Sequence, residues 1–189
     1  MEKTAVQKLA GALKVLVTIT LVCNLVALLL VPGMSLMKGP EELLALTPYE
    51  NPLEVPLRVG IAFVLSWGWV WTAGVYEVVL ALFLLFCGIC TAVILWQGRR
   101  VLGTILQGAP FSTQNAVSLR RAAVCSFCIA GAALLRTIWG LWFYQSLRPL
   151  ATYNALFVPI FTMFGLLCLV MSALFRQATE MKAENDLTI

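Results

Sequence analysis

Residues 75–96 read VYEVVLALFLLFCGICTAVILW, and the only charged side chain among them is Glu77. An α-helix rises about 1.5 Å per residue, so a run of this length crosses the roughly 30 Å hydrocarbon layer of a bilayer. Three other stretches match it in length and apolar character: 13–31, 122–144 and 151–175. A segment in lipid must pair its backbone polar groups internally, which favours helices. The sequence therefore predicts an all-α membrane protein, built as a bundle of four transmembrane helices.

The composition of the whole chain agrees with a membrane protein. Of its 189 residues, 61% are hydrophobic and 12% are charged, and the mean hydropathy is +0.91. A soluble domain carries about 25% charged residues, so this chain lacks the usual solubilising surface. Its length suits one domain, and we predict a single membrane domain over residues 1–189. No small-residue cleavage site follows the first apolar run, so we expect the first helix to be retained.

The basic residues predict the orientation of the chain. If the amino terminus lies inside, nine lysines and arginines fall on the cytoplasmic side, three fall outside and Arg136 lies within a helix. This positive-inside bias places both termini in the cytoplasm. The same topology gives an outer loop of residues 32–74, an inner loop of residues 97–121 and a cytoplasmic tail of residues 176–189.

Within the outer loop, the segment 57–71 is apolar but shorter than a typical crossing, and Gly60 and Gly68 interrupt it. It is compatible with a short fifth crossing, an interfacial helix or a pair of short strands. The alternation WGWVW at residues 67–71 favours extended structure, and tryptophans are typical of a membrane interface. We therefore expect an extended segment that lies outside, against the outer leaflet.

The inner loop begins with apolar residues at helical spacing over 101–106, which predict an amphipathic extension of the second helix at the membrane surface. Gly108 and Pro110 are expected to end this extension. Ser112 is then placed as the N-cap of the third helix, with Phe111 before it as a hydrophobic staple. The stretch is either a simple helix stop and start or a docking surface for a partner.

Three short motifs resemble one bacterial membrane family. They are Gly108-x-Pro110-Phe111-Ser112-x-x-Asn115, Leu119-Arg120-Arg121 and Glu184-Asn185-Asp186-Leu187-Thr188-Ile189. The family is catalogued as a domain of unknown function (family 2975), and the resemblance covers about the second half of the chain. It implies an integral protein of the inner (plasma) membrane whose gene is often paired with that of a small Cro/C1-like helix-turn-helix regulator. No catalytic residues are established for the family, so none are carried over.

The resemblance and the topology together predict a non-enzymatic regulator. It would bind or sequester the helix-turn-helix protein at the cytoplasmic face in response to a membrane or envelope signal, without binding nucleic acid itself. The candidate docking residues are Arg99, Arg100, Pro110, Phe111, Ser112, Asn115, Asp186, Leu187, Thr188 and Ile189. The last residues are equally compatible with a frayed terminus. The sequence leaves self-association into a homo-oligomer open.

Arg136 lies inside the third apolar run, where a charge normally has a partner. Glu77 is the nearby acid in a crossing segment, and antiparallel neighbours would bring the two residues together. The sequence predicts a Glu77–Arg136 ion pair, acting either as a structural pin or as a sensor of an outside ligand. A small transporter or channel component would use the same two residues, although the lack of an internal repeat argues against it. Asn24 and Asn154 are candidates for hydrogen bonds between helices.

The cysteines form two CxxC pairs, Cys87 with Cys90 and Cys125 with Cys128, on consecutive predicted helices. Residues three apart share a helix face, so four thiols are placed to hold zinc, copper or an iron–sulfur cluster. A thiol or metal-binding membrane protein is thus a further alternative. Against it, CxxC knuckles use a turn rather than a helix, and no nearby charge favours thiolates. The chain has no histidine, a common metal ligand, and we expect no cofactor.

Overall fold

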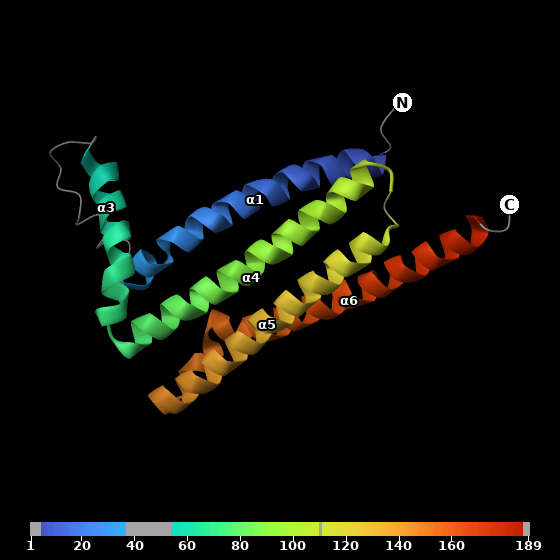
Figure 1. The fold of residues 1–189 in the computed structure, drawn as a ribbon. Helices are drawn as coiled ribbons and strands as arrows, with labels where there is room; N and C mark the ends of the chain where they lie inside the picture. The colour runs from blue at the N-terminus through green and yellow to red at the C-terminus, as the bar shows by residue number, and fades with distance from the viewer. Residues whose placement is uncertain (1–4, 37–53, 110, 187–189) are drawn as a thin grey trace. The chain divides into compact units, whose positions relative to one another are not determined.

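A computed structural model of the protein describes residues 5–36, 54–109 and 111–186. In these ranges all regular structure is helical, and no strand is present (Figure 1). The elements are α1 (Ala5–Leu36), α3 (Glu54–Trp69), the 3-10 turn η1 (Val70–Thr72), α4 (Val75–Leu106), α5 (Thr113–Tyr144), the 3-10 turn η2 (Arg148–Ala151) and α6 (Tyr153–Asp186). The predicted all-α fold class is confirmed.

Four of these helices are long and apolar enough to cross a membrane. The candidate spans are Gln7–Gly33 in α1, Val75–Leu106 in α4, Thr113–Tyr144 in α5 and Tyr153–Glu184 in α6. Large apolar side chains remain exposed along all four, which is the surface expected of a protein whose solvent is lipid. The prediction of four transmembrane helices is confirmed, and the chain is a multi-pass membrane protein.

The spanning helices are longer than the apolar runs that predicted them. Helices α1, α4 and α5 have 32 residues each, and α6 has 34. At 1.5 Å per residue they measure about 50 Å, well beyond the roughly 30 Å of hydrocarbon. The predicted inner loop of residues 97–121 is therefore reduced to a turn at residues 107–112, which we name the α4–α5 turn. Residues 101–106 are helical, as the end of α4, whereas their predicted position at the membrane surface stays a prediction.

The extended interpretation of residues 57–71 is wrong, because this segment belongs to helix α3 and the turn η1. The alternation that suggested a strand covers only five residues, and the buried residues Ser66 and Val70 are four apart, as on one face of a helix. The Trp67 indole Nε1 donates a hydrogen bond to the Leu29 carbonyl oxygen at 3.1 Å, and Val70 is 1% exposed. Trp69 and Trp71 face outward.

Residues 25–88 form one compact unit, and residues 1–24 with 89–189 form a second. The core of the first unit consists of Val31, Val70 and Ala81, with two half-buried leucines of α4 packed against them. Gly88 of α4 allows a close approach in this unit: a Cβ added there would lie 2.5 Å from a methyl carbon of Leu28. Small residues on α4 thus permit the end of α1 to pack closely here.

In the second unit, α5 and α6 pack side by side along their lengths (Figure 1). The face of α5 that is buried is made almost entirely of small residues: Ala116, Ser118, Ala122, Ala123, Ser126, Ala130, Ala133, Thr137 and Gly140. On α6, the buried Gly165 lies under the Phe127 ring, 3.0 Å from where a Cβ would be. The Ser172 hydroxyl donates a hydrogen bond to the Ala116 carbonyl oxygen at 2.7 Å. Small residues and a polar bridge are the usual means by which helices associate in lipid.

Helix α4 joins this pair through a three-helix cluster. Ile94 of α4 and Phe127 of α5 pack against the buried Ala122, Ala123 and Cys168. Beyond this cluster, α4 runs without interruption to the α4–α5 turn. The position of the turn is therefore fixed from one side by apolar packing between α4, α5 and α6.

Candidate functional site

The α4–α5 turn begins with a helix-ending motif at Gly108. This glycine has a φ of +77°, in the left-handed region that residues with a Cβ rarely adopt. The Gly108 amide donates to the Ile105 carbonyl oxygen at 3.1 Å, and the Ala109 amide donates to the Thr104 carbonyl oxygen at 3.0 Å. These two hydrogen bonds define a Schellman motif, which satisfies carbonyl groups left free at the end of a helix. The predicted helix end at Gly108 is confirmed, whereas Pro110 lies outside the described residues.

Helix α5 starts with the predicted N-cap, Ser112. Its backbone is extended, with φ −136° and ψ 144°, and its hydroxyl oxygen accepts a hydrogen bond from the Asn115 amide at 3.3 Å. The cap thereby satisfies one of the free amide groups of the first turn. The prediction that Ser112 caps this helix is confirmed.

A polar bridge joins the two helices just behind the turn. Asn115 is 1% exposed, and its side-chain amide Nδ2 donates to the Thr104 hydroxyl oxygen at 2.6 Å. The Thr104 hydroxyl in turn donates to the Val101 carbonyl oxygen at 2.7 Å. Burial of an amide is costly unless it is hydrogen-bonded, so this bridge specifies how α4 and α5 meet. Among the docking candidates, Asn115 therefore braces the turn from inside rather than presenting its side chain to a partner.

Phe111 is the exposed aromatic residue of the turn. Its ring meets the Phe175 ring of α6 edge to face, with 5.9 Å between the ring centres and an angle of 87° between the planes. Even so, 51% of Phe111 remains exposed. An aromatic side chain that is half exposed on a well-ordered turn resembles the anchor residue of a binding surface.

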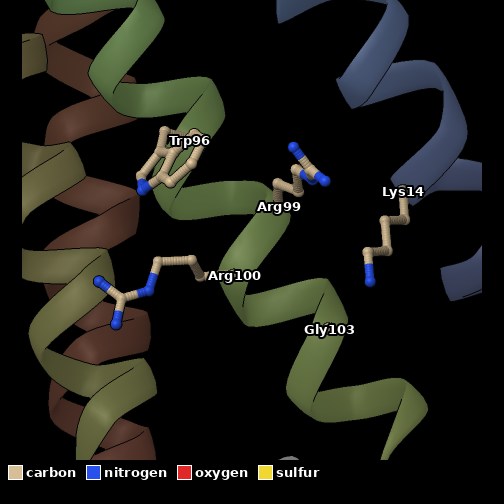
Figure 2. Close-up of a pocket in the computed structure, with 5 residues that line it drawn as sticks. All are labelled: Lys14, Trp96, Arg99, Arg100 and Gly103. Carbon is tan, nitrogen blue, oxygen red and sulfur yellow. The ribbon is translucent and has the colours of Figure 1, made fainter.

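Three cations gather a short distance along α4 from the turn (Figure 2). Lys14, Trp96, Arg99, Arg100 and Gly103 line a cavity of about 280 Å³. The Arg99 guanidinium lies 5.8 Å from the centre of the Trp96 ring, within the range of a cation–π interaction. Arg99 and Arg100 leave α4 on opposite sides, while Lys14 reaches from α1 toward Gly103. We name this group the basic pocket.

The basic pocket was only half visible in the sequence. Arg99 and Arg100 were docking candidates there, but Lys14 counted only toward the orientation and Trp96 was not considered. A smaller cavity of about 140 Å³ connects Arg100 with Thr104 and with polar residues of the turn. One signal in the sequence could have revealed the pocket. Lys14 stands near the start of one apolar run and Arg99 just after the end of the next, and two runs that cross in opposite directions bring these ends to the same side of the membrane.

The carboxyl-terminal docking candidates are only partly described. Helix α6 continues to Asp186, so residues 176–186 of the predicted tail are helical. On this extension the side chains of Arg176 and Glu180 form an ion pair at 3.3 Å, and both are well exposed. Leu187, Thr188 and Ile189 lie outside the described residues, so their docking role stays a prediction.

Arg136 has a polar partner on the neighbouring helix. Its guanidinium Nη1 donates a hydrogen bond to the Asn154 side-chain oxygen at 3.2 Å, which links α5 to α6. The predicted role of Asn154 in a hydrogen bond between helices is confirmed. Glu77 belongs to the other compact unit, in the first turn of α4, where an acid is favoured by the helix dipole. The Glu77–Arg136 ion pair stays a prediction.

The six cysteines are all free thiols. Cys90 of α4 and Cys125 of α5 lie within hydrogen-bonding contact of each other, and Cys87 belongs to the other compact unit. In the part of the chain that the structure describes, no group of three or more histidines, cysteines or acids is placed to hold a metal ion. The metal-binding alternative therefore gains no geometric support from Cys87, Cys90, Cys125 and Cys128.

Comparison with known proteins gives a family but no described relative. No curated protein and no solved structure matches the chain. One family's sequence model matches residues 46–189, which includes α3, α4, α5 and α6. The family likeness thus reaches well into the predicted outer loop, further toward the amino terminus than the short motifs indicated. With four apolar spanning helices and this match over most of its length, the chain belongs to the family described as "Protein of unknown function (DUF2975)".

Proposed function

We propose that this protein is a non-enzymatic membrane regulator. It holds a small helix-turn-helix transcription regulator at the cytoplasmic side of the plasma membrane and releases it in response to a membrane or envelope signal. The observation on which the proposal depends is Phe111, which is 51% exposed on a turn whose backbone is fixed by hydrogen bonds on both sides. The identity of the partner rests on the gene pairing implied by the family resemblance.

The rigidity of the α4–α5 turn supports a role in binding. The Schellman motif at Gly108, the Ser112 cap and the Asn115–Thr104 bridge order the described residues on both sides of the turn. A surface that is already ordered loses less conformational entropy when a partner binds.

The chemistry around Phe111 also supports a protein partner. The neighbouring Gln107, Thr113 and Gln114 are exposed and polar, so the aromatic ring has the polar rim that is typical of protein interfaces. Arg100 adds positive charge beside the turn. This charge favours an acidic face of the partner. A DNA-binding face is itself basic, so the partner would dock through another face and be kept from DNA by its tether to the membrane.

The signal would reach the docking surface through the helices themselves. Helices α4 and α5 continue without a break from their spanning segments into the turn, and Phe175 on α6 touches Phe111. A shift of α6 along α5 would therefore change how much of the Phe111 ring is covered. Small shifts between packed helices are a common form of conformational switching.

The test is retention of the partner by the full chain in nanodiscs. The helix-turn-helix regulator encoded beside the gene is passed over the immobilised protein, and the bound fraction is measured for the natural chain, Phe111→Ala and Phe143→Ala. Phe143 is the matched control, because it is 53% exposed and lies at the far end of α5. We expect Phe111→Ala to weaken binding by about 10- to 30-fold, the loss typical of an anchor residue, and Phe143→Ala to change it less than twofold. Failure of the natural chain to retain the regulator would overturn the proposal.

A further inference from the structure

We infer that the basic pocket, formed by Lys14, Trp96, Arg99, Arg100 and Gly103, binds a phosphate group, and that an anionic phospholipid headgroup is the expected source of that phosphate. This function is separate from partner docking at Phe111. It does not depend on the helix-turn-helix regulator.

The first argument is the unbalanced charge of the pocket. Among the residues that the structure describes, three cations and no carboxylate line a cavity of about 280 Å³, close to the smallest sites that hold small molecules, about 300 Å³. Lys14 and Arg99 approach it from two different helices, and Arg100 stands on the other side of α4 (Figure 2). Cations that line one cavity attract an anion, because it offsets their positive charge. Arginine pairs with phosphate through two parallel hydrogen bonds, which makes phosphate the best-fitting anion.

The second argument is the position of the pocket along the two helices. Lys14 is the second residue of the apolar run 13–31 of α1, and Arg99 and Arg100 follow the apolar run 75–96 of α4 after two further residues. These are the points where a spanning helix leaves the hydrocarbon layer and enters the headgroup layer. Trp96 is 51% exposed at the same level, and tryptophan is enriched at that interface. Lipid phosphates therefore lie at the depth of the pocket.

The third argument is the shape of the pocket floor. At Gly103, an added Cβ would lie 3.6 Å from the Lys14 ammonium nitrogen. This is an ordinary van der Waals distance, so a Cβ alone would fit, whereas a longer side chain would take up space beside the ammonium. A larger residue at this position would fill the cavity and leave all three cations in the chain. This gives a variant that separates the pocket from its charge.

The test uses the full-length chain in nanodiscs that contain phosphatidylglycerol in a phosphatidylcholine background. Native mass spectrometry measures how many phosphatidylglycerol molecules stay bound to the released protein. The variants are the double substitution Lys14→Gln with Arg99→Gln, the cavity-filling Gly103→Leu, and the control Arg120→Gln with Arg121→Gln. The control removes the same two charges from exposed positions on α5 that do not line the pocket. Size-exclusion profiles and helical circular dichroism show that each variant is folded.

We expect the Lys14→Gln/Arg99→Gln variant to weaken phosphatidylglycerol retention by about 25-fold, at about fivefold for each charge near an anionic surface. Gly103→Leu should also weaken it at least fivefold, and the control pair should stay within twofold of the natural chain. A second arm adds inorganic phosphate to the protein in pure phosphatidylcholine. Saturable phosphate binding there, lost in the same two variants, supports the phosphate site and identifies soluble phosphate as the source. Equal losses in the pocket pair and the control pair, or no binding in either arm, would overturn the inference.

Discussion

The two connections of the second compact unit differ in close packing. The α4–α5 turn is flanked by a Schellman motif, a serine cap and a buried amide. The α5–α6 connection, residues 145–152, is also hydrogen-bonded, since the Thr152 hydroxyl donates to the Pro149 carbonyl oxygen at 2.6 Å. In addition, its Pro149 ring lies directly on Gly140, 3.2 Å from where a Cβ would be. The surroundings also differ. Trp142, Leu147 and Tyr153 beside the second connection are each more than 70% exposed, whereas exposed polar residues of the α4–α5 region surround Phe111, namely Gln107, Thr113 and Gln114.

The difference indicates which surroundings suit the α4–α5 turn and which suit the α5–α6 connection. Exposed tryptophan, tyrosine and leucine suit a membrane interface, where the rings lie at the level of the lipid headgroups. A polar turn with one exposed phenylalanine and a basic pocket suits water, a protein partner and lipid phosphate. The following substitutions test whether packing at one end and hydrogen bonding at the other are truly separate devices.

The largest effect is expected from Gly140→Leu at the packed end. A leucine there must push Pro149 away from α5, and overpacking of this kind costs about 3 kcal/mol. Gly131→Leu is the control, because it lies on the same helix with no atom within 4 Å of an added Cβ. Thermal unfolding in detergent should show a melting temperature lowered by about 6–12 °C for Gly140→Leu, with little change for the control. Equal shifts for the two variants would show that close packing does not hold this connection.

A smaller loss is expected from Asn115→Ala at the hydrogen-bonded end. The substitution removes the donor to Thr104 from a buried position, which costs about 2 kcal/mol. The adjacent and exposed Gln114→Ala is the control. Hydrogen–deuterium exchange should show faster exchange of the amides at residues 104–109 in Asn115→Ala only. Unchanged exchange would mean that the polar bridge does not order the turn.

The smallest effects are expected from two glycine-to-alanine substitutions in the same region, which should change the stability of the protein in opposite directions. Gly108→Ala forces a Cβ into the left-handed conformation, which destabilises by about 1 kcal/mol. Gly98→Ala places alanine inside α4 with open space around the new Cβ, which stabilises a helix by up to about 1 kcal/mol. The two melting temperatures should therefore move in opposite directions. A fall in both would contradict the assignment of the helix end.

The sequence alone predicted the features that depend on local physics. The four spanning helices follow from the length of the apolar runs, and the Gly108 end and Ser112 cap follow from the preferences of those residues for helix termini. The error at residues 57–71 came from a five-residue alternation. So short a pattern does not distinguish a strand from a helix when the flanking residues are apolar too.

Features that depend on contacts between distant parts of the chain could not be predicted. Nothing near Lys14 in the sequence indicates that it reaches Gly103, and Asn115 looked like a docking residue because its burial against Thr104 depends on how α4 and α5 pack. Arg136 is a further case in which the sequence did not predict the contact. Its need for a partner was predicted from its depth, but the sequence did not indicate that Asn154 of the next helix would accept a hydrogen bond from it.

The excess length of the spanning helices has a consequence of its own. Each measures about 50 Å, against roughly 30 Å of hydrocarbon, so the thickness of the bilayer decides how far the α4–α5 turn stands in water. A mismatch costs only a fraction of a kcal/mol per Å, which makes the height of Phe111 above the lipid adjustable by membrane composition. Stretching, cooling or a change of acyl chains would thus change how far Phe111 stands above the lipid.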